Sequence, residues 1–193
     1  MKISIKNLGW IVLCMVSASQ LCIADNRESS NVKRMVLNAK GESEAYLCTI
    51  PSTTLGTTQA LCFDVPLYDM KKNRYVGTMQ DALADVQSSA EHPGALIATA
   101  TSTFTFYKRT KSSSFTTRVL GQVQPFLQDN DEMTHMTSYY STPNQNDIIA
   151  ATGRFQNKRA TARESGSINL SQFTGQPGDI VTYDLLWIIE FFE

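Results

Sequence analysis

Apolar and polar residues alternate with a period of two along most of the chain from about residue 44 onward. The clearest case is the segment 95–108, whose one face carries Leu, Ala and Phe while the other carries mainly Thr. This alternation predicts a β-strand with one buried face, and threonine is enriched in strands. Serines at 112–114 form a turn before the next alternating segment, 115–127, so the two segments are predicted to form a hairpin.

Two features of the strand pattern predict special packing. Gly121 stands in the middle of the second hairpin strand, which indicates a bend or a close approach, as at a barrel corner. The last segment, 180–192, is largely apolar on both faces, with Asp184 and Glu190 interrupting the second one. We therefore expect a barrel interior on one side of this strand and a subunit interface or another partner on the other side.

Together the segments predict an all-β protein. Turn signals rich in Gly, Pro, Asn and Asp separate about eight to ten strands. No helix of more than two turns is indicated, although residues 81–89 fit a helix as well as a strand. An antiparallel barrel or sandwich follows. The further strands are predicted over 45–50, 60–68, 74–85, 133–140, 147–151 and 159–170.

The first 24 residues have the pattern of a signal peptide. Lys2 and Lys6 precede an apolar run at 8–16, and small residues lead to a predicted cleavage after Ala24. Cleavage near residue 18 and an uncleaved anchor are the alternatives. The pattern predicts a secreted protein, extracellular or periplasmic. Residues 25–43 are predicted to form a flexible leader with at most one short element, and residues 44–193 to form the barrel domain.

Two of the four cysteines, Cys48 and Cys62, remain after signal removal. An even pair in an exported protein favours a disulfide, which would close a loop of about 15 residues and contribute about 3 kcal/mol in the chain-entropy model. Two buried free thiols in adjacent strands are the alternative. Neither cysteine has a neighbouring histidine or a Cys-x-x-Cys partner, so we expect no metal site here.

The net charge of the chain limits the classes of partner that we expect it to bind. The 193 residues include 17 Lys and Arg against 18 Asp and Glu, a net charge of −1. Loss of Lys2 and Lys6 with the signal changes this balance to 15 against 18, or −3. A nucleic-acid binder would show a basic excess, so no nucleic-acid partner is expected, and no membrane partner after signal cleavage. Hydrophobic residues make up 42% of the chain, which is enough for a packed core.

Three stretches in order resemble the plant dirigent proteins and the related allene oxide cyclases. The segment 63–68 is similar to an Asp-Asp-Pro-Leu-Thr motif and 76–80 to Val-Gly-Arg-Ala-Gln. The segment 151–160 is similar to Gly-Gly-Thr-Gly-x-Phe followed by Ala-Arg-Gly, with alanine replacing two glycines. The resemblance covers about residues 45–193. It implies an eight-stranded antiparallel barrel, a homotrimer and an apolar cavity open at one end. Gly153 is also predicted to need a positive φ before Phe155, an aromatic that plugs the barrel end.

The resemblance also implies site residues. Asp64 and Arg159 match the Asp and Arg that orient a phenolic substrate during coupling, and are the predicted catalytic residues. A turn-capping carboxylate and a structural arginine are the alternatives. Arg154 departs from the acidic residue that many dirigents have there. The predicted substrate-binding residues are Tyr68, Tyr107, Phe155 and Asp184, and the carboxylates considered for cyclase chemistry are Asp64, Glu132, Asp184 and Glu190.

These observations lead to a function hypothesis. The protein is predicted to bind a small apolar or phenolic compound and to steer its cyclisation or coupling, as a cofactor-free isomerase or a stereochemical guide that uses positioning alone. The alternatives are a non-catalytic binding barrel and a structural or interaction module whose barrel is filled with side chains. No metal or cofactor is expected, since the two histidines have no ligand spacing.

Overall fold

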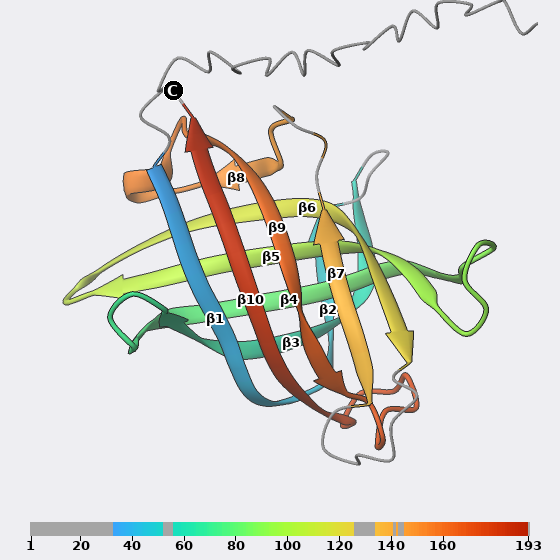
Figure 1. Cartoon of the computed structure of the whole chain (residues 1–193). Coiled ribbons are helices and arrows are strands. Elements are labelled where there is room, and N and C mark those ends of the chain that lie inside the picture. Colours follow the sequence, from blue (N-terminus) through green and yellow to red (C-terminus); the bar gives the residue numbers. More distant parts are fainter. Residues whose placement is uncertain (1–32, 52–55, 126–133, 141, 143–144, 193) are drawn as a thin grey trace, which may run out of the picture.

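The computed structural model describes residues 33–51, 56–125, 134–140, 142 and 145–192. This part of the chain forms ten strands and one short 3-10 helix (Figure 1). The predicted signal peptide and residues 25–32 lie outside the described residues, as does Glu132. The elements are β1 (Lys33–Glu44), β2 (Tyr46–Pro51), β3 (Thr57–Asp69), β4 (Arg74–Ser88), β5 (Leu96–Lys108), β6 (Lys111–Pro125), β7 (His135–Tyr140), β8 (Ile148–Ala151), η1 (Gly153–Phe155), β9 (Arg159–Asn169) and β10 (Ile180–Phe192).

Eight of the strands close into an antiparallel barrel. The sheet runs in the order β1-β10-β9-β7-β6-β5-β4-β3, and β1 pairs again with β3, where residues 37–39 face residues 67–69. Closure removes the exposed sheet edges along the barrel wall. β2 extends the sheet from the first half of β3, and β8 pairs with the first half of β6. The predicted eight-stranded antiparallel barrel is therefore confirmed, and the helix alternative over 81–89 is wrong.

The predicted strand faces are confirmed. Phe104 and Phe106 of β5 and Phe115 of β6 are buried, whereas Thr103 and Thr105 of β5 are half-buried on the outer side. On β10 the alternate residues from Val181 to Phe191 are all buried. The second face of β10 leaves Leu186 37% exposed, so the subunit interface or partner predicted for it stays a prediction.

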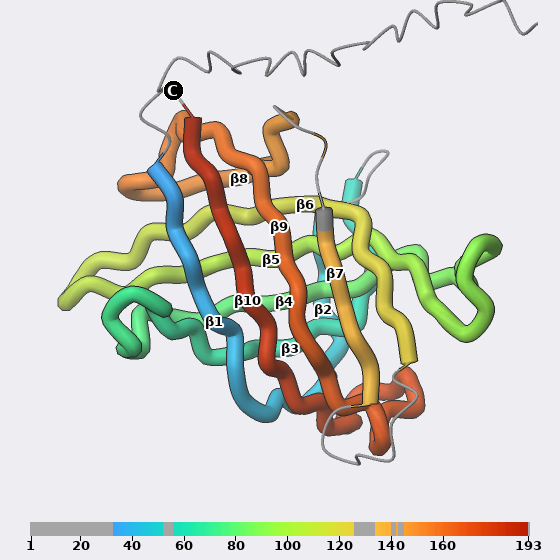
Figure 2. The backbone as a smooth tube through the Cα atoms, viewed as in Figure 1, coloured from blue at the N-terminus to red at the C-terminus, as the bar shows by residue number. Residues whose placement is uncertain are grey.

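The predicted leader is wrong for residues 33–43, because they belong to β1. This 12-residue strand pairs along its whole length with β10, from Lys33 opposite Phe191 to Glu44 opposite Ile180. Figure 2 shows the two strands side by side. β1 directs Leu37 into the core and keeps mostly polar residues outside. The barrel therefore begins at Lys33, eleven positions before the predicted start.

The predicted cysteine pair is confirmed at bonding distance. Cys48 on β2 and Cys62 on β3 have Cα atoms 5.9 Å apart and form a disulfide. Such pairs are typical of oxidising compartments. Cys62 belongs to a second, small apolar cluster between β2 and the outer side of β3 and β4, together with Ile50 and Ala82. The bond thus fixes β2 against the barrel wall.

Two glycines behave as predicted. A Cβ atom at Gly121 would overlap the ring of Tyr139, which packs on it from the neighbouring strand β7. Gly153 has a φ of +56° at the start of η1, in the left-handed region that favours glycine. Phe155, two residues later, is buried. The turn at Gly153 thus returns this aromatic ring to the barrel.

Candidate functional site

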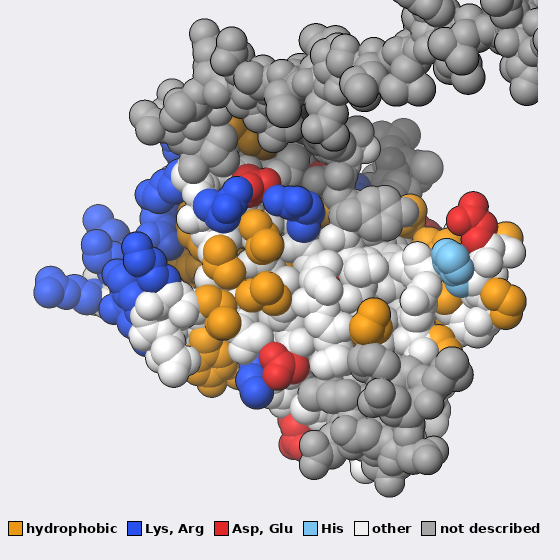
Figure 3. All heavy atoms as spheres, viewed as in Figure 1, with side chains coloured by type: hydrophobic (Ala, Val, Ile, Leu, Met, Phe, Trp, Pro, Cys, Tyr) orange, Lys and Arg blue, Asp and Glu red, His pale blue; other side chains and the backbone are white. Residues whose placement is uncertain are grey.

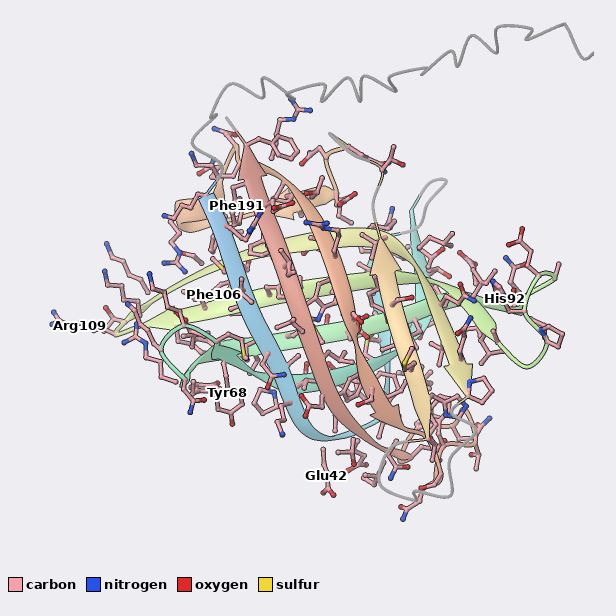
Figure 4. The ribbon with its side chains drawn as sticks, in the orientation of Figure 1. Glu42, Tyr68, His92, Phe106, Arg109 and Phe191 are labelled. Carbon is pink, nitrogen blue, oxygen red and sulfur yellow. A yellow bond between two sulfur atoms is a disulfide. The ribbon has the colours of Figure 1, made fainter. Side chains whose placement is uncertain are left out.

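A pocket of about 530 Å³ opens at the barrel end where β1 begins and β10 ends. We name it the end pocket. In Figure 4, Phe191 and Phe106 lie toward this end, far from His92 at the opposite end. The described residues that line the pocket are Lys33, Met35, Arg154, Phe155, Lys158, Phe191 and Phe192.

The floor of the end pocket is built by η1 and the end of β10. The backbone N–H of Thr152 donates to the carbonyl oxygen of Ser114 (2.8 Å), which anchors the start of η1 on β6. The ring of Phe155 then stacks on that of Phe191, with centroids 5.7 Å apart, and meets Phe115 edge-on at 4.9 Å. Stacked and edge-to-face rings are both favourable aromatic arrangements. The floor is therefore a rigid, aromatic surface.

Cations surround this apolar floor. The guanidinium carbon of Arg154 lies 4.7 Å from the ring centroid of Phe155 and 5.2 Å from that of Phe106, a cation–π geometry. Lys33 and Lys158 are exposed at the same opening. Among the described residues, no carboxylate forms an ion pair with any of these three cations. The end pocket therefore combines an apolar body with unneutralised positive charge at its rim.

The described lining of the end pocket holds no histidine and no carboxyl group. Its described residues are cations, phenylalanines and one methionine. General acid–base catalysis uses groups such as histidine or a carboxyl whose pKa lies near the working pH. No such group is among the described lining residues.

The acidic groups of the interior gather instead at the barrel centre. Asp81 on β4 is 1% exposed. It accepts hydrogen bonds from the hydroxyls of Ser102 (2.7 Å) and Tyr139 (3.4 Å). Burial raises the pKa of Asp81 from 3.8 to about 6, even though these two hydrogen bonds favour the ionised form. Asp81 is thus a buried acid whose pKa is raised to about 6.

Glu164 on β9 lies in the same interior region and is 3% exposed. Its Oε2 accepts a hydrogen bond from the hydroxyl of Thr137 at 3.5 Å, and its Oε1 has no hydrogen-bond partner among the described residues. Burial, and then the negative charge of Asp81, raise the pKa of Glu164 well above its ordinary value. Directly opposite on β10, the indole N–H of Trp187 is buried and has no acceptor in the described part of the chain. We name Asp81, Glu164, Tyr139 and Trp187 the central cluster.

Aromatic rings separate the central cluster from the end pocket. Consecutive centroid distances are 4.9 Å from Phe155 to Phe115, 4.8 Å from Phe115 to Phe104, and 5.0 Å from Phe104 to Trp187. Tyr139 completes the series at 5.5 Å from Trp187. The rings thus form a continuous series of contacts between the two regions, and neither buried acid is among the described residues that line the end pocket.

The predicted catalytic residues lie on the outer surface. Asp64 is exposed on β3, opposite Gln80 of β4. Arg159 is exposed at the start of β9, with its guanidinium 5.3 Å from the ring centroid of Phe192. Since β1 and β10 stand between β3 and β9 in the sheet, the structure does not bring the two side chains together. Their catalytic role stays a prediction.

Of the four predicted substrate-binding residues, Phe155 alone lines the end pocket. Tyr68 packs edge-on against Tyr75 on the outer side, with centroids 6.0 Å apart. Tyr107 is 54% exposed. Asp184, on the outer face of β10, accepts hydrogen bonds from Asn38 (2.9 Å) and Lys40 (3.0 Å). The last three residues lie on the outer side of the barrel wall and do not line the end pocket.

Sequence reasoning missed most of the charged groups in both regions. Asp81 lies two residues after Met79, and Glu164 two residues after Ala162. In a strand, residues two apart lie on the same face. Assigning an inner face to those two strands would have flagged both acids. Lys33 carried no such signal, because β1 was predicted as a leader.

Neither a metal centre nor a spanning helix occurs in the described residues. No group of three or more His, Cys, Asp or Glu is placed there to hold a metal ion. None of the helical structure described is long and apolar enough to cross a membrane.

Comparison with protein-family models, curated proteins and solved structures found no match to this chain. The resemblance to the allene oxide cyclases and dirigent proteins therefore stays a prediction. The eight-stranded barrel that it implies is present.

Proposed function

We propose that the protein binds a small amphipathic anion, an aromatic or aliphatic acid, in the end pocket. The observation that carries this proposal is the joining of three cations, which form no ion pair among the described residues, to a floor of phenylalanine rings. The volume of about 530 Å³ suits a small molecule, since ligand pockets commonly measure about 300–1,000 Å³. This is the binding alternative among the functions considered for the sequence. Steering of a coupling reaction by positioning alone stays a prediction.

The aromatic floor and the cationic rim of the pocket would recognise different parts of the ligand. Phe155, Phe191 and Phe192 offer ring surface to the apolar body of the ligand. Lys158 and Arg154 offer donors to its carboxylate, and hydrogen bonds between charged groups contribute about 1.5–3 kcal/mol. A neutral ligand of the same shape would lose this second contribution.

We further propose that binding takes place outside the cytosol. The pattern of residues 1–24 and the Cys48–Cys62 pair both support export to an oxidising compartment.

Fluorescence titration tests the proposal. The probes are 1-anilinonaphthalene-8-sulfonate and its uncharged counterpart N-phenyl-1-naphthylamine, added to the chain from residue 25 to 193. We expect the sulfonate to bind more tightly and to be displaced by 4-hydroxycinnamate or decanoate. The double variant Arg154→Gln/Lys158→Gln should weaken sulfonate binding about 10-fold or more, since two charged donors are lost.

A matched variant controls for net charge. Lys40→Gln/Arg163→Gln removes two exposed cations from the outer barrel wall, which form ion pairs with Asp184 and Glu190. Its affinity for the sulfonate should equal that of the unsubstituted chain. Equal affinity of the two probes, or equal losses in the two double variants, would contradict the proposal.

A further inference from the structure

Basic residues are concentrated at the barrel end that holds the pocket. Three connecting segments meet at this end: residues 69–74 between β3 and β4, residues 108–111 between β5 and β6, and residues 152–158 between β8 and β9. Among their residues a single one, Asp69, is acidic. Figure 3 shows the Lys and Arg side chains gathered around the hairpin tips at the left. The eight basic residues are Lys71, Lys72, Arg74, Lys108, Arg109, Lys111, Arg154 and Lys158.

This concentration contrasts with the charge of the whole chain, which is −1. All eight cations are exposed, and none forms an ion pair among the described residues. We name these eight residues the basic end. The chain is therefore strongly polarised, a property that its net charge conceals.

Large apolar side chains are exposed among the cations. Met70 is 50% exposed in the β3–β4 turn, and Tyr75 and Tyr107 are 52% and 54% exposed on the adjoining strands. The hydroxyls of Tyr107 and Thr78 are 3.2 Å apart, at hydrogen-bonding distance. Tyrosine is enriched where proteins meet the headgroup region of a bilayer, because its ring is apolar and its hydroxyl polar.

Arg109 has a backbone conformation that other residue types adopt more readily than arginine. It stands at the tip of the β5–β6 hairpin with a φ of +53°. Glycine and asparagine adopt this region at lower cost than arginine. The hairpin thus carries a cation at its outermost point at some expense in backbone energy. A binding role for that cation accounts for its presence there.

We propose that the basic end docks on the surface of a bilayer that contains anionic phospholipid. The cations would face the lipid phosphates, and Met70, Tyr75 and Tyr107 would enter the headgroup layer. A Lys or Arg near an anionic membrane surface strengthens binding about 5-fold. The interspersed apolar side chains favour a bilayer over a soluble polyanion, which would leave them in water. This proposal departs from the expectation that net charge suggested. The basic end shares Arg154 and Lys158 with the end pocket, so the tests of docking use variants of its other cations.

Vesicle co-sedimentation tests the docking. The chain from residue 25 to 193 is mixed with vesicles of phosphatidylcholine, with or without about 30% phosphatidylglycerol, at roughly 0.1 M salt. We expect the chain to bind only to the vesicles that contain phosphatidylglycerol. This binding should be lost at about 0.5 M salt, where the Debye length becomes short.

Two matched pairs of variants locate the surface. Lys108→Gln/Lys111→Gln should weaken vesicle binding about 10-fold or more, while Lys40→Gln/Arg163→Gln, with the same change in net charge, should leave it unchanged. Met70→Ser should weaken binding about 3-fold, since an apolar contact is lost. Met136→Ser alters a methionine of equal exposure (49%) at the start of β7, near the opposite barrel end, and should have no effect.

Three outcomes would overturn the proposal. One is the absence of binding to the anionic vesicles, and another is equal weakening by both double variants. The third is binding of heparin or a DNA oligonucleotide, lost in Lys108→Gln/Lys111→Gln, without vesicle binding; the basic end would then be a site for soluble polyanions. None of these results bears on the sulfonate titration with Arg154→Gln/Lys158→Gln, so the two proposals fail separately.

Discussion

The central cluster and the basic end concentrate opposite charges in opposite surroundings. Asp81 and Glu164 are removed from water with few hydrogen-bond partners, and their pKa values rise. The cations of the basic end stay in water, without ion pairs among the described residues. Charge in the first region therefore affects mainly the free energy of folding. Charge in the second is available to a partner at little cost in stability.

Removing a ring between the two regions gives the largest expected effect. Phe115→Ala deletes a fully buried side chain that contacts Phe104, Phe155 and Phe191. Such truncations cost about 3–5 kcal/mol. Urea unfolding followed by tryptophan fluorescence measures the loss. Phe192→Ala, at the half-buried edge of the pocket, should cost clearly less. Equal losses would mean that the rings do not form a packed separation.

Asp81→Asn tests the energetic cost of the central cluster. The folded-state pKa of Asp81, about 6, lies above the ordinary 3.8, so the folded state binds the proton more tightly. Stability from this group is complete below about pH 4 and is lost as the pH rises through about 6. At pH 7 the cost is about 3 kcal/mol. The amide cannot ionise, so the variant should be more stable than the unsubstituted chain at pH 7.

Unfolding at pH 4 and pH 7 measures this difference. The advantage of Asp81→Asn should vanish at pH 4, where the carboxyl of the unsubstituted chain is protonated in the folded state. Asp64→Asn, which changes an exposed carboxylate, should leave stability nearly unchanged at both pH values. An Asp81→Asn variant that is less stable at pH 7 would show that the hydrogen bonds to Ser102 and Tyr139 outweigh the desolvation of Asp81.

Arg109→Asn separates binding from stability at the basic end. Asparagine tolerates a φ of +53° better than arginine. We expect a gain of about 1 kcal/mol in stability, together with weaker binding to anionic vesicles. Lys108→Asn, at the strand position before it, should weaken vesicle binding without the gain in stability. A loss of stability in Arg109→Asn would disprove the cost assigned to this backbone.

The smallest expected effect lies outside both regions. Glu190 accepts hydrogen bonds from Arg34 on β1 (2.9 Å) and Arg163 on β9 (2.7 Å). Their side chains are partly exposed, so Glu190→Gln should cost about 0.5–1 kcal/mol, and less in high salt. Glu91→Gln, an exposed acid without an ion pair in the described structure, provides the reference. A cost above about 2 kcal/mol would place this network with the buried charges instead.

Most of the barrel follows from periodicity. The faces of β5, β6 and β10 were predictable because each alternates apolar and polar residues over many positions. β1 was not, because the segment is polar on its outer face and its partners on β10 are about 150 residues away. The ion pair of Lys40 with Asp184 illustrates this: neither residue indicates a strand until the other is placed opposite it.

The candidate site was less predictable than the fold. Phe155 and Gly153 were found because a turn and an aromatic ring at a barrel end have local requirements. Lys33 and Lys158 meet at the end pocket because β1 and β9 pair with the two sides of β10, which no local pattern encodes. The basic end could not be predicted from the sequence for a related reason. Its three segments are separated by dozens of residues, and a total net charge averages over them.

The pairing of β1 with β10 has a consequence for the time course of folding. β1 is the first of the described strands to be made, and it pairs along its entire length with β10, the last of them. The consecutive hairpins from β3 to β6 can form while synthesis or export continues. β1 can pair with β10 only after β10 has been made. Contacts so distant in sequence form slowly. We therefore expect barrel closure to be the slow step, during which the apolar inner face of β10 is open to chaperones and to aggregation.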